Sequence, residues 1–165
     1  MRIETAFDQY HRAVFDFAYR LTRSTDVAED VTQECFLALM RAPDRFDPAR
    51  GTLKTYLFSI ARNLVLKHYR DTRAEEVDLD QVSSAADPTA ALEISSAVGD
   101  AVAQLPHLQQ EALILFEYEG FALEEIAQVL ETEVGTVKSR LHRARASLKR
   151  RLAPFRNVGG IHGAV

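Results

Sequence analysis

The residues best suited to a binding role are cations gathered near the C-terminus. Residues 134 to 156 carry eight Lys or Arg and no Asp or Glu. Before them, Ile126, Ala127 and Leu130 follow helical spacing, a short turn comes next, and a second helical pattern begins at Gly135. This is helix-turn-helix spacing. A basic second helix can enter the DNA major groove, where Arg and Lys donate hydrogen bonds to guanine.

The expected contacts of this second helix lie largely off its apolar seam of Val137, Leu141 and Ala144. Arg140, close to the seam, is expected to hold a backbone phosphate, and Thr136 is expected to cap the helix. The DNA-binding set is Thr136, Lys138, Ser139, Arg140, His142, Arg143 and Arg145. No acid within this segment can pair with its cations, which favours DNA contact over an ordinary solvated surface.

The net charge of −4 conceals a strong segregation of charge along the chain. Residues 74 to 133 carry fourteen Asp or Glu and no Lys or Arg, whereas residues 54 to 73 carry five Lys or Arg against the single Asp71. Two basic stretches therefore flank an acidic one. This distribution indicates two separate contacts with a polyanion, although either stretch alone could be a solvated helix face.

An acidic helix face is expected in the first third of the chain. Asp30, Gln33 and Glu34 fall three and four residues apart, so they share one polar face opposite an apolar stripe. Such a face can bind a basic partner helix. An ordinary solvated acidic surface is the alternative interpretation.

Three helices are expected to position the N-terminal groups. Apolar spacing predicts helices over about residues 5 to 22, 24 to 41 and 52 to 69. Ser24 and Asp26 can cap the second of them, because both side chains accept hydrogen bonds. The first is expected to bury one stripe made of Phe7, Tyr10, Val14, Phe17 and Leu21, and the second to bury Cys35. The predicted first domain is residues 1–73.

A linker and a second helical domain are expected to follow. Residues 74–90 are acidic, rich in Ser and Ala and broken by Pro88, which is typical of a flexible linker. Residues 91–153 resume helical patterning, with a helix beginning at Pro106 and ending at Gly120, and residues 154–165 form a flexible tail. The predicted fold class is all-α, with two small helical domains and a helix-turn-helix in the second.

Enzymatic chemistry is not supported by the residue pattern. The five histidines have no metal-ligand spacing, no Gly-rich loop follows a strand, and the adjacent Glu124 and Glu125 do not form an acid–base pair. We expect no catalytic residues, metal, cofactor or small-molecule substrate. No run of 18 apolar residues and no signal segment occurs, and the single Cys35 excludes an internal disulfide, so a cytoplasmic protein without membrane insertion is predicted.

The helix-turn-helix segment resembles a known family. The string EEIAQVLETEVGTVKSRLHRARASL is similar, almost residue by residue, to the motif of extracytoplasmic-function RNA polymerase sigma factors of the sigma-70 family. In that family this domain is region 4, and it reads the minus-35 promoter element. The resemblance covers about residues 5 to 153 and implies a protein that binds core RNA polymerase and directs promoter recognition and transcription initiation.

Two strings in the first half resemble region 2 of the same family. DVAEDVTQECF, from residue 26, is similar to the segment that grips the polymerase clamp, which implies polymerase-binding roles for Asp26, Glu29, Asp30, Gln33 and Glu34. The string from Gly51 to Arg73 resembles the minus-10 reading and strand-opening segment. The implied DNA-binding residues there are Lys54, Tyr56, Arg62, Asn63, Lys67 and Arg70, with Asn63 lining a pocket for a flipped base.

Two positions depart from the family pattern, since Tyr56 stands where many relatives have Trp and Lys67 where many have Asp. For Tyr56, a core aromatic beside Leu57 remains an equal interpretation. The resemblance also implies an anti-sigma factor as a partner. Two alternatives stay open: a stand-alone repressor or activator that binds duplex DNA, and a sigma-like decoy that occupies polymerase without starting transcription.

Overall fold

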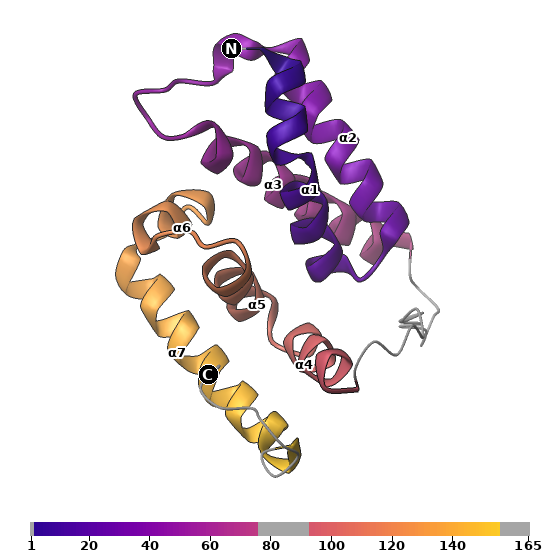
Figure 1. Ribbon diagram of the computed structural model, residues 1–165, viewed down its shortest axis with the longest axis vertical. Helices are drawn as coiled ribbons and strands as arrows, with labels where there is room; N and C mark the ends of the chain where they lie inside the picture. The colour runs from indigo at the N-terminus through magenta and orange to yellow at the C-terminus, as the bar shows by residue number, and fades with distance from the viewer. Residues whose placement is uncertain (1, 76–92, 156–165) are drawn as a thin grey trace. The chain divides into compact units, whose positions relative to one another are not determined.

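In the computed structural model, residues 2–75 and 93–155 are described, and both ranges are built from helices (Figure 1). They form two compact units, one on α1 to α3 and the other on α4 to α7. No strand occurs in either range, and none of the described helices is long and apolar enough to cross a membrane. The predicted all-α fold with two helical domains is confirmed.

The first domain is a bundle of three helices, α1 (Ile3–Thr22), α2 (Thr25–Arg41) and α3 (Leu53–Glu75), with a short 3₁₀ turn η1 (Pro43–Arg45). Each helix packs on the other two (Figure 1). The largest fully buried side chains of this domain are Val14, Phe17, Leu39, Leu57, Phe58 and Val65. Burying each such side chain favours folding by roughly 1.5–3 kcal/mol, so this core holds the three helix axes in place.

The helix starts follow from capping side chains. Ser24 accepts a hydrogen bond from the Val27 N–H, 3.2 Å away, as predicted, whereas Asp26 lies in the first turn of α2 and is not the cap. At α3, the Thr52 hydroxyl accepts from the Thr55 N–H, also across 3.2 Å. These bonds satisfy N–H groups that have no partner within the helix.

The core prediction for Phe7 is wrong. Its side chain is 41% exposed, although it shares helical spacing with the buried Val14 and Phe17. Its ring stacks on His11, with centroids 4.6 Å apart, and its edge meets Phe36 at 5.0 Å. Helical periodicity identifies an apolar stripe, but it does not show where that stripe leaves the core.

The second domain contains α4 (Glu93–Ala103), α5 (His107–Leu113), a π-helical turn η2 (Ile114–Tyr118), α6 (Leu123–Val129), α7 (Val134–Leu152) and a 3₁₀ turn η3 (Ala153–Phe155). The long α7 packs on α4 and α5. Its buried seam is Val137, Leu141, Ala144, Leu148 and Leu152, which confirms the predicted apolar face of this helix.

The approach to the helix-turn-helix contains a feature that the sequence did not predict. Pro106 immediately precedes α5 and Gly120, at φ +70°, ends the segment, both as expected. Between them, the Glu119 N–H donates to the Ile114 oxygen five residues earlier, which makes η2 a π turn. Glu111 of α5 is fully buried, with its Oε1 2.8 Å from His107 Nε2. Leu108 of the same helix is 48% exposed.

The predicted linker at residues 74–90 and tail at residues 154–165 fall mainly outside the described residues. Ala74 and Glu75 are the last two residues of α3, so that helix extends beyond the predicted domain end at residue 73. At the other end, the described chain closes with η3, which includes Pro154.

Candidate nucleic-acid and protein interfaces

The acidic face of α2 is exposed over its whole length. Its residues lie three or four positions apart around the helix, and the buried Ala28, Val31 and Cys35 occupy the opposite side. The exposed set is Asp26, Glu29, Asp30, Gln33 and Glu34, which we call the acidic α2 face. Among these residues Glu34 has an ion-pair contact, 3.8 Å from the Arg41 guanidinium. The remaining carboxylates of the face are available to a basic partner.

An apolar groove adjoins this face, and sequence reasoning missed it. It has a volume of about 640 Å³ and lies between α1 and α2, and its apolar lining consists of Ile3, Phe7, Phe36, Leu37 and Met40. Leu37 is 36% exposed and Met40 55% exposed. Both follow Gln33 at helical spacing, so the acidic α2 face continues directly into apolar surface. The rim adds the carboxylates of Glu4 and Asp8.

The predicted single-strand contacts divide into two groups on α3. Tyr56, Asn63 and Arg70 are seven residues apart, and Lys67 lies between the last two, so these four share one face of the helix. Asn63, Lys67 and Arg70 are exposed. The core side chains Leu57, Phe58, Ala61 and Val65 lie on the other side of α3. One face of α3, which we call the α3 face, therefore carries the Asn63 amide, the Lys67 and Arg70 cations and the Tyr56 ring.

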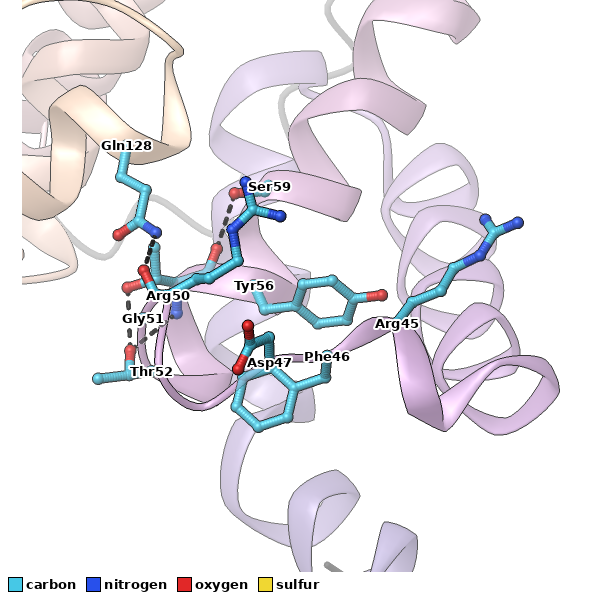
Figure 2. Close-up of a pocket in the computed structure, with 10 residues that line it drawn as sticks. Arg45, Phe46, Asp47, Arg50, Gly51, Thr52, Tyr56, Ser59 and Gln128 are labelled. Carbon is cyan, nitrogen blue, oxygen red and sulfur yellow. Dashed lines mark hydrogen bonds between the residues drawn. The ribbon is translucent and has the colours of Figure 1, made fainter.

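Tyr56 is neither a core residue nor a fully free ring. It is half-buried, and its ring lies against that of Phe46 with centroids 5.5 Å apart (Figure 2). The neighbouring Leu57 is completely buried instead. Phe46 precedes α3 and is half-buried as well, so the two rings form an aromatic pair at the start of the α3 face. Phe46 was not among the predicted site residues, because its partner Tyr56 is ten residues away along the chain.

Lys54 and Arg62 lie apart from that face. They stand four residues before and four after the buried Phe58, and so lie on its row rather than on the row of Asn63. The Lys54 ammonium lies 5.8 Å from the Phe58 ring centroid, where a cation is attracted to the ring face. These two cations therefore lie on a different side of α3 from Asn63.

Helix α7 exposes four of the seven residues in the predicted DNA-binding set. Lys138, Ser139, His142 and Arg143 are exposed, while Thr136, Arg140 and Arg145 are half-buried. Before α7, the turn of the motif includes Glu131 at φ +52°, and the Thr132 N–H closes the end of α6 on the Ala127 oxygen at 2.9 Å. The exposed row is the part of α7 that can meet base edges in a groove.

The expected cap at Thr136 is wrong. The helix begins at Val134, with Glu133 in extended backbone geometry as its N-cap and no side-chain capping bond. Thr136 is therefore the third residue of α7. Its side chain is half-buried within the first turn rather than capping it.

Two cations of α7 have surroundings that sequence reasoning did not find. Arg145 Nη2 donates to Glu117 Oε1 at 3.1 Å, so an acid 28 residues upstream pairs with this helix. Its guanidinium carbon also lies 5.1 Å from the Phe116 ring centroid. Arg140 has a buried Nη1 atom without a hydrogen bond in the described part of the chain. The acidic partner of Arg145 thus comes from outside the basic segment, which itself contains no acid.

A metal centre is not formed by the described side chains. Within residues 2–75 and 93–155, no three His, Cys, Asp or Glu side chains lie close enough to hold a metal ion. Cys35 is fully buried, and burial raises the pKa of its thiol to about 12, against a smaller lowering by the Ala61 backbone. Such a thiol is a poor nucleophile at neutral pH.

Comparison with known proteins identifies relatives of both domains. A family model described as Sigma-70 region 2 matches residues 6–75, and one described as Sigma-70, region 4 matches residues 95–148. The ECF RNA polymerase sigma factor EcfG of Rhodopseudomonas palustris is 39% identical over 137 residues, which are 80% of this chain and 75% of the relative. The ECF RNA polymerase sigma factor SigM of Mycobacterium tuberculosis is 34% identical over 161 residues, 93% of this chain and 80% of the relative.

Solved structures are similar over nearly the whole chain. The sigma factor RpoE of Bartonella quintana, in complex with the anti-sigma factor NepR, has a TM-score of 0.76 at 28% identity, covering 91% of this chain and 96% of that one. CnrH, in complex with the cytosolic domain of CnrY, has a TM-score of 0.71 at 25% identity, covering 92% and 88%.

Proposed function

The chain belongs to the extracytoplasmic-function sigma factors of the sigma-70 family, and from that membership we infer how each of its surfaces acts in transcription initiation. As a member of this family it binds core RNA polymerase and directs promoter recognition and transcription initiation. We assign residues 1–73 to region 2 and residues 91–153 to region 4. RNA synthesis is the work of the polymerase, and no catalytic residue is assigned to this chain.

The polymerase clamp is proposed to bind the acidic α2 face. The exposed carboxylates of Asp30 and Glu34 are suited to a basic helix, and the groove beside them offers Leu37 and Met40 to its apolar residues. A partner helix with a basic edge and an apolar edge would match both surfaces at once. The continuity of charge and apolar surface along one helix supports this assignment.

The minus-10 element is proposed to be opened on the α3 face. Asn63 would hydrogen-bond a flipped base, because an amide both donates and accepts. Lys67 and Arg70 would hold the strand backbone, and the rings of Tyr56 and Phe46 offer a stacking surface at the start of the helix. The observation that carries the function is this: one three-helix core holds the acidic α2 face and the exposed Asn63 face together.

The minus-35 element is proposed to be read by α7 in duplex form. Lys138, Ser139, His142 and Arg143 would meet base edges in the major groove, since all four are exposed along the recognition helix. Arg140 and Arg145 would serve as phosphate contacts at the flanks. The duplex-reading helix and the strand-opening helix belong to different domains, as expected for two promoter elements.

An anti-sigma factor is proposed as the regulator of this chain. The similar RpoE is described in complex with the anti-sigma factor NepR. A regulator that covered the acidic α2 face or the α7 surface would keep the chain from polymerase or from promoters. Because polymerase and promoter DNA are cytoplasmic in bacteria, the proposed site of action is the cytoplasm.

Transcription from a random promoter library tests the proposed function. The full chain is added to purified core polymerase and the library, and the transcripts are sequenced. The proposal expects new start sites preceded by two asymmetric elements, which appear only when both proteins are present. Duplex binding at symmetric sites without polymerase would favour a repressor, and polymerase binding without transcripts would favour a decoy.

A further inference from the structure

One side chain of the recognition helix is engaged within its own domain. Arg145 donates to the Glu117 carboxylate at 3.1 Å and lies over the Phe116 ring at 5.1 Å. Glu117 and Phe116 are adjacent residues of η2, so the π turn presents a carboxylate and a ring face to the same guanidinium. Both kinds of group attract a cation.

Arg145 also belongs to the α7 surface that is proposed to bind DNA. It lies seven residues after Lys138 and three after His142, so the three side chains form one row along α7. Arg145 is at the edge of that row, one residue after the buried Ala144. From this edge the guanidinium has two possible anionic partners, the Glu117 carboxylate and a DNA phosphate.

The ion pair with Glu117 is open to solvent. The Arg145 side chain is 38% exposed and the Glu117 side chain 44% exposed. Exposed pairs of this kind contribute little to folding stability, because water solvates the separated charges well. The carboxylate is therefore better placed to influence what Arg145 binds than to hold the domain together.

We propose that Glu117 restrains DNA binding by the second domain, because it occupies the Arg145 guanidinium until a promoter phosphate displaces it. The proposal rests on the assignment of α7 to duplex promoter DNA. Glu117 is thus a residue that sets affinity without contacting DNA. When the pair opens, the Glu117 carboxylate is left near the DNA phosphates and repels them. This repulsion lowers the affinity for DNA and reduces the net release of counterions on binding.

The test compares Glu117→Gln with Glu124→Gln in the full chain assembled with core polymerase. Both changes remove one negative charge, but Glu124 is an exposed residue of α6, whereas Glu117 is the acid paired with Arg145. Binding of a duplex promoter recovered from the random library is measured over a range of salt concentrations. Glu117→Gln should tighten binding by about threefold to tenfold and steepen the logarithmic salt dependence by up to about 0.9. Glu124→Gln should have a smaller effect.

The same pair of substitutions is then made with Arg145→Ala. If Glu117 acts through Arg145, Glu117→Gln no longer exceeds Glu124→Gln in this background. An equal gain with and without Arg145 overturns the proposal in favour of a general charge effect, and weaker binding of Glu117→Gln overturns it in favour of a positioning role. If the unaltered holoenzyme recovers no duplex from the library, the proposed function itself fails, which is a separate result.

Discussion

The thiol of Cys35 donates a hydrogen bond to the main-chain oxygen of Leu57, 3.2 Å away. This bond joins α2, which carries the acidic face, to α3, which carries Asn63. Cys35 and Leu57 are both completely buried. A second link is made by Tyr69 of α3, whose hydroxyl donates to the Leu21 oxygen at the end of α1. The acidic α2 face and the α3 face that carries Asn63 are thus parts of one packed unit.

Cys35 should therefore be unreactive in the folded chain. Its pKa of about 12, compared with 9.0 for a free thiol, leaves roughly a thousandfold less thiolate at pH 8. Alkylation by iodoacetamide should be very slow in buffer and fast in guanidinium chloride. The chain has one cysteine, so the measured rate reports this site alone. Fast alkylation in buffer would show that the α2–α3 core opens readily.

Charge reversal on the acidic α2 face should greatly weaken polymerase binding without unfolding the chain. Asp30→Lys with Glu34→Lys places cations opposite a basic partner, which should weaken affinity for core polymerase by about tenfold or more. Asp44→Lys with Asp71→Lys makes the same charge change at exposed acids outside α2. Pull-down with core polymerase separates the two variants, and equal affinities would rule out the acidic α2 face.

The apolar groove should be a second part of the polymerase contact. Met40→Asp places a charge in exposed apolar surface, so we expect little change in stability, within about 0.5 kcal/mol, and a clear loss of polymerase binding. Leu108→Asp in the second domain is the matched control, since Leu108 is also an exposed large apolar residue. Thermal unfolding checks the fold of both. If Met40→Asp binds polymerase normally, the groove has another role.

Alanine substitutions on α7 should distinguish the proposed base contacts from the proposed phosphate contact. Lys138→Ala and Arg143→Ala should each cost roughly 1–3 kcal/mol and relax sequence preference at particular minus-35 positions. Arg140→Ala should weaken binding evenly across sequences and flatten the salt dependence. Selection from randomised minus-35 elements measures both effects. Losses that are independent of sequence in all three variants would reduce the domain to an electrostatic anchor.

The helices and the exposure of most predicted site residues could be predicted from the sequence, because local periodicity shows which face of each helix is apolar. The cap at Ser24 likewise predicted where α2 begins. Contacts between distant segments could not. The pairing of Arg145 with Glu117 depends on the packing of α7 near η2, and the exposure of Phe7 and Met40 depends on where the bundle ends. The cap at Thr136 failed because capping preference does not show which residue adopts extended geometry, here Glu133.

Strand opening distinguishes a sigma factor from a repressor, and Asn63 is the residue on which the proposed opening depends. Asn63→Ala should leave duplex binding through α7 nearly unchanged, because Asn63 is an exposed residue of the other domain. A flipped base would lose its partner while its unstacking still costs a few kcal/mol. A promoter with a mismatched bubble removes that cost in advance, so it should restore part of the activity.

Permanganate footprinting of promoter thymines is the most direct measurement of this step. With the unaltered chain and core polymerase, thymines around the minus-10 element should become reactive. With Asn63→Ala, their reactivity should fall sharply on duplex promoters and return on the mismatched bubble. Normal melting by the variant would contradict the role of Asn63, and absence of melting by the unaltered chain across many promoters would contradict the proposed function itself.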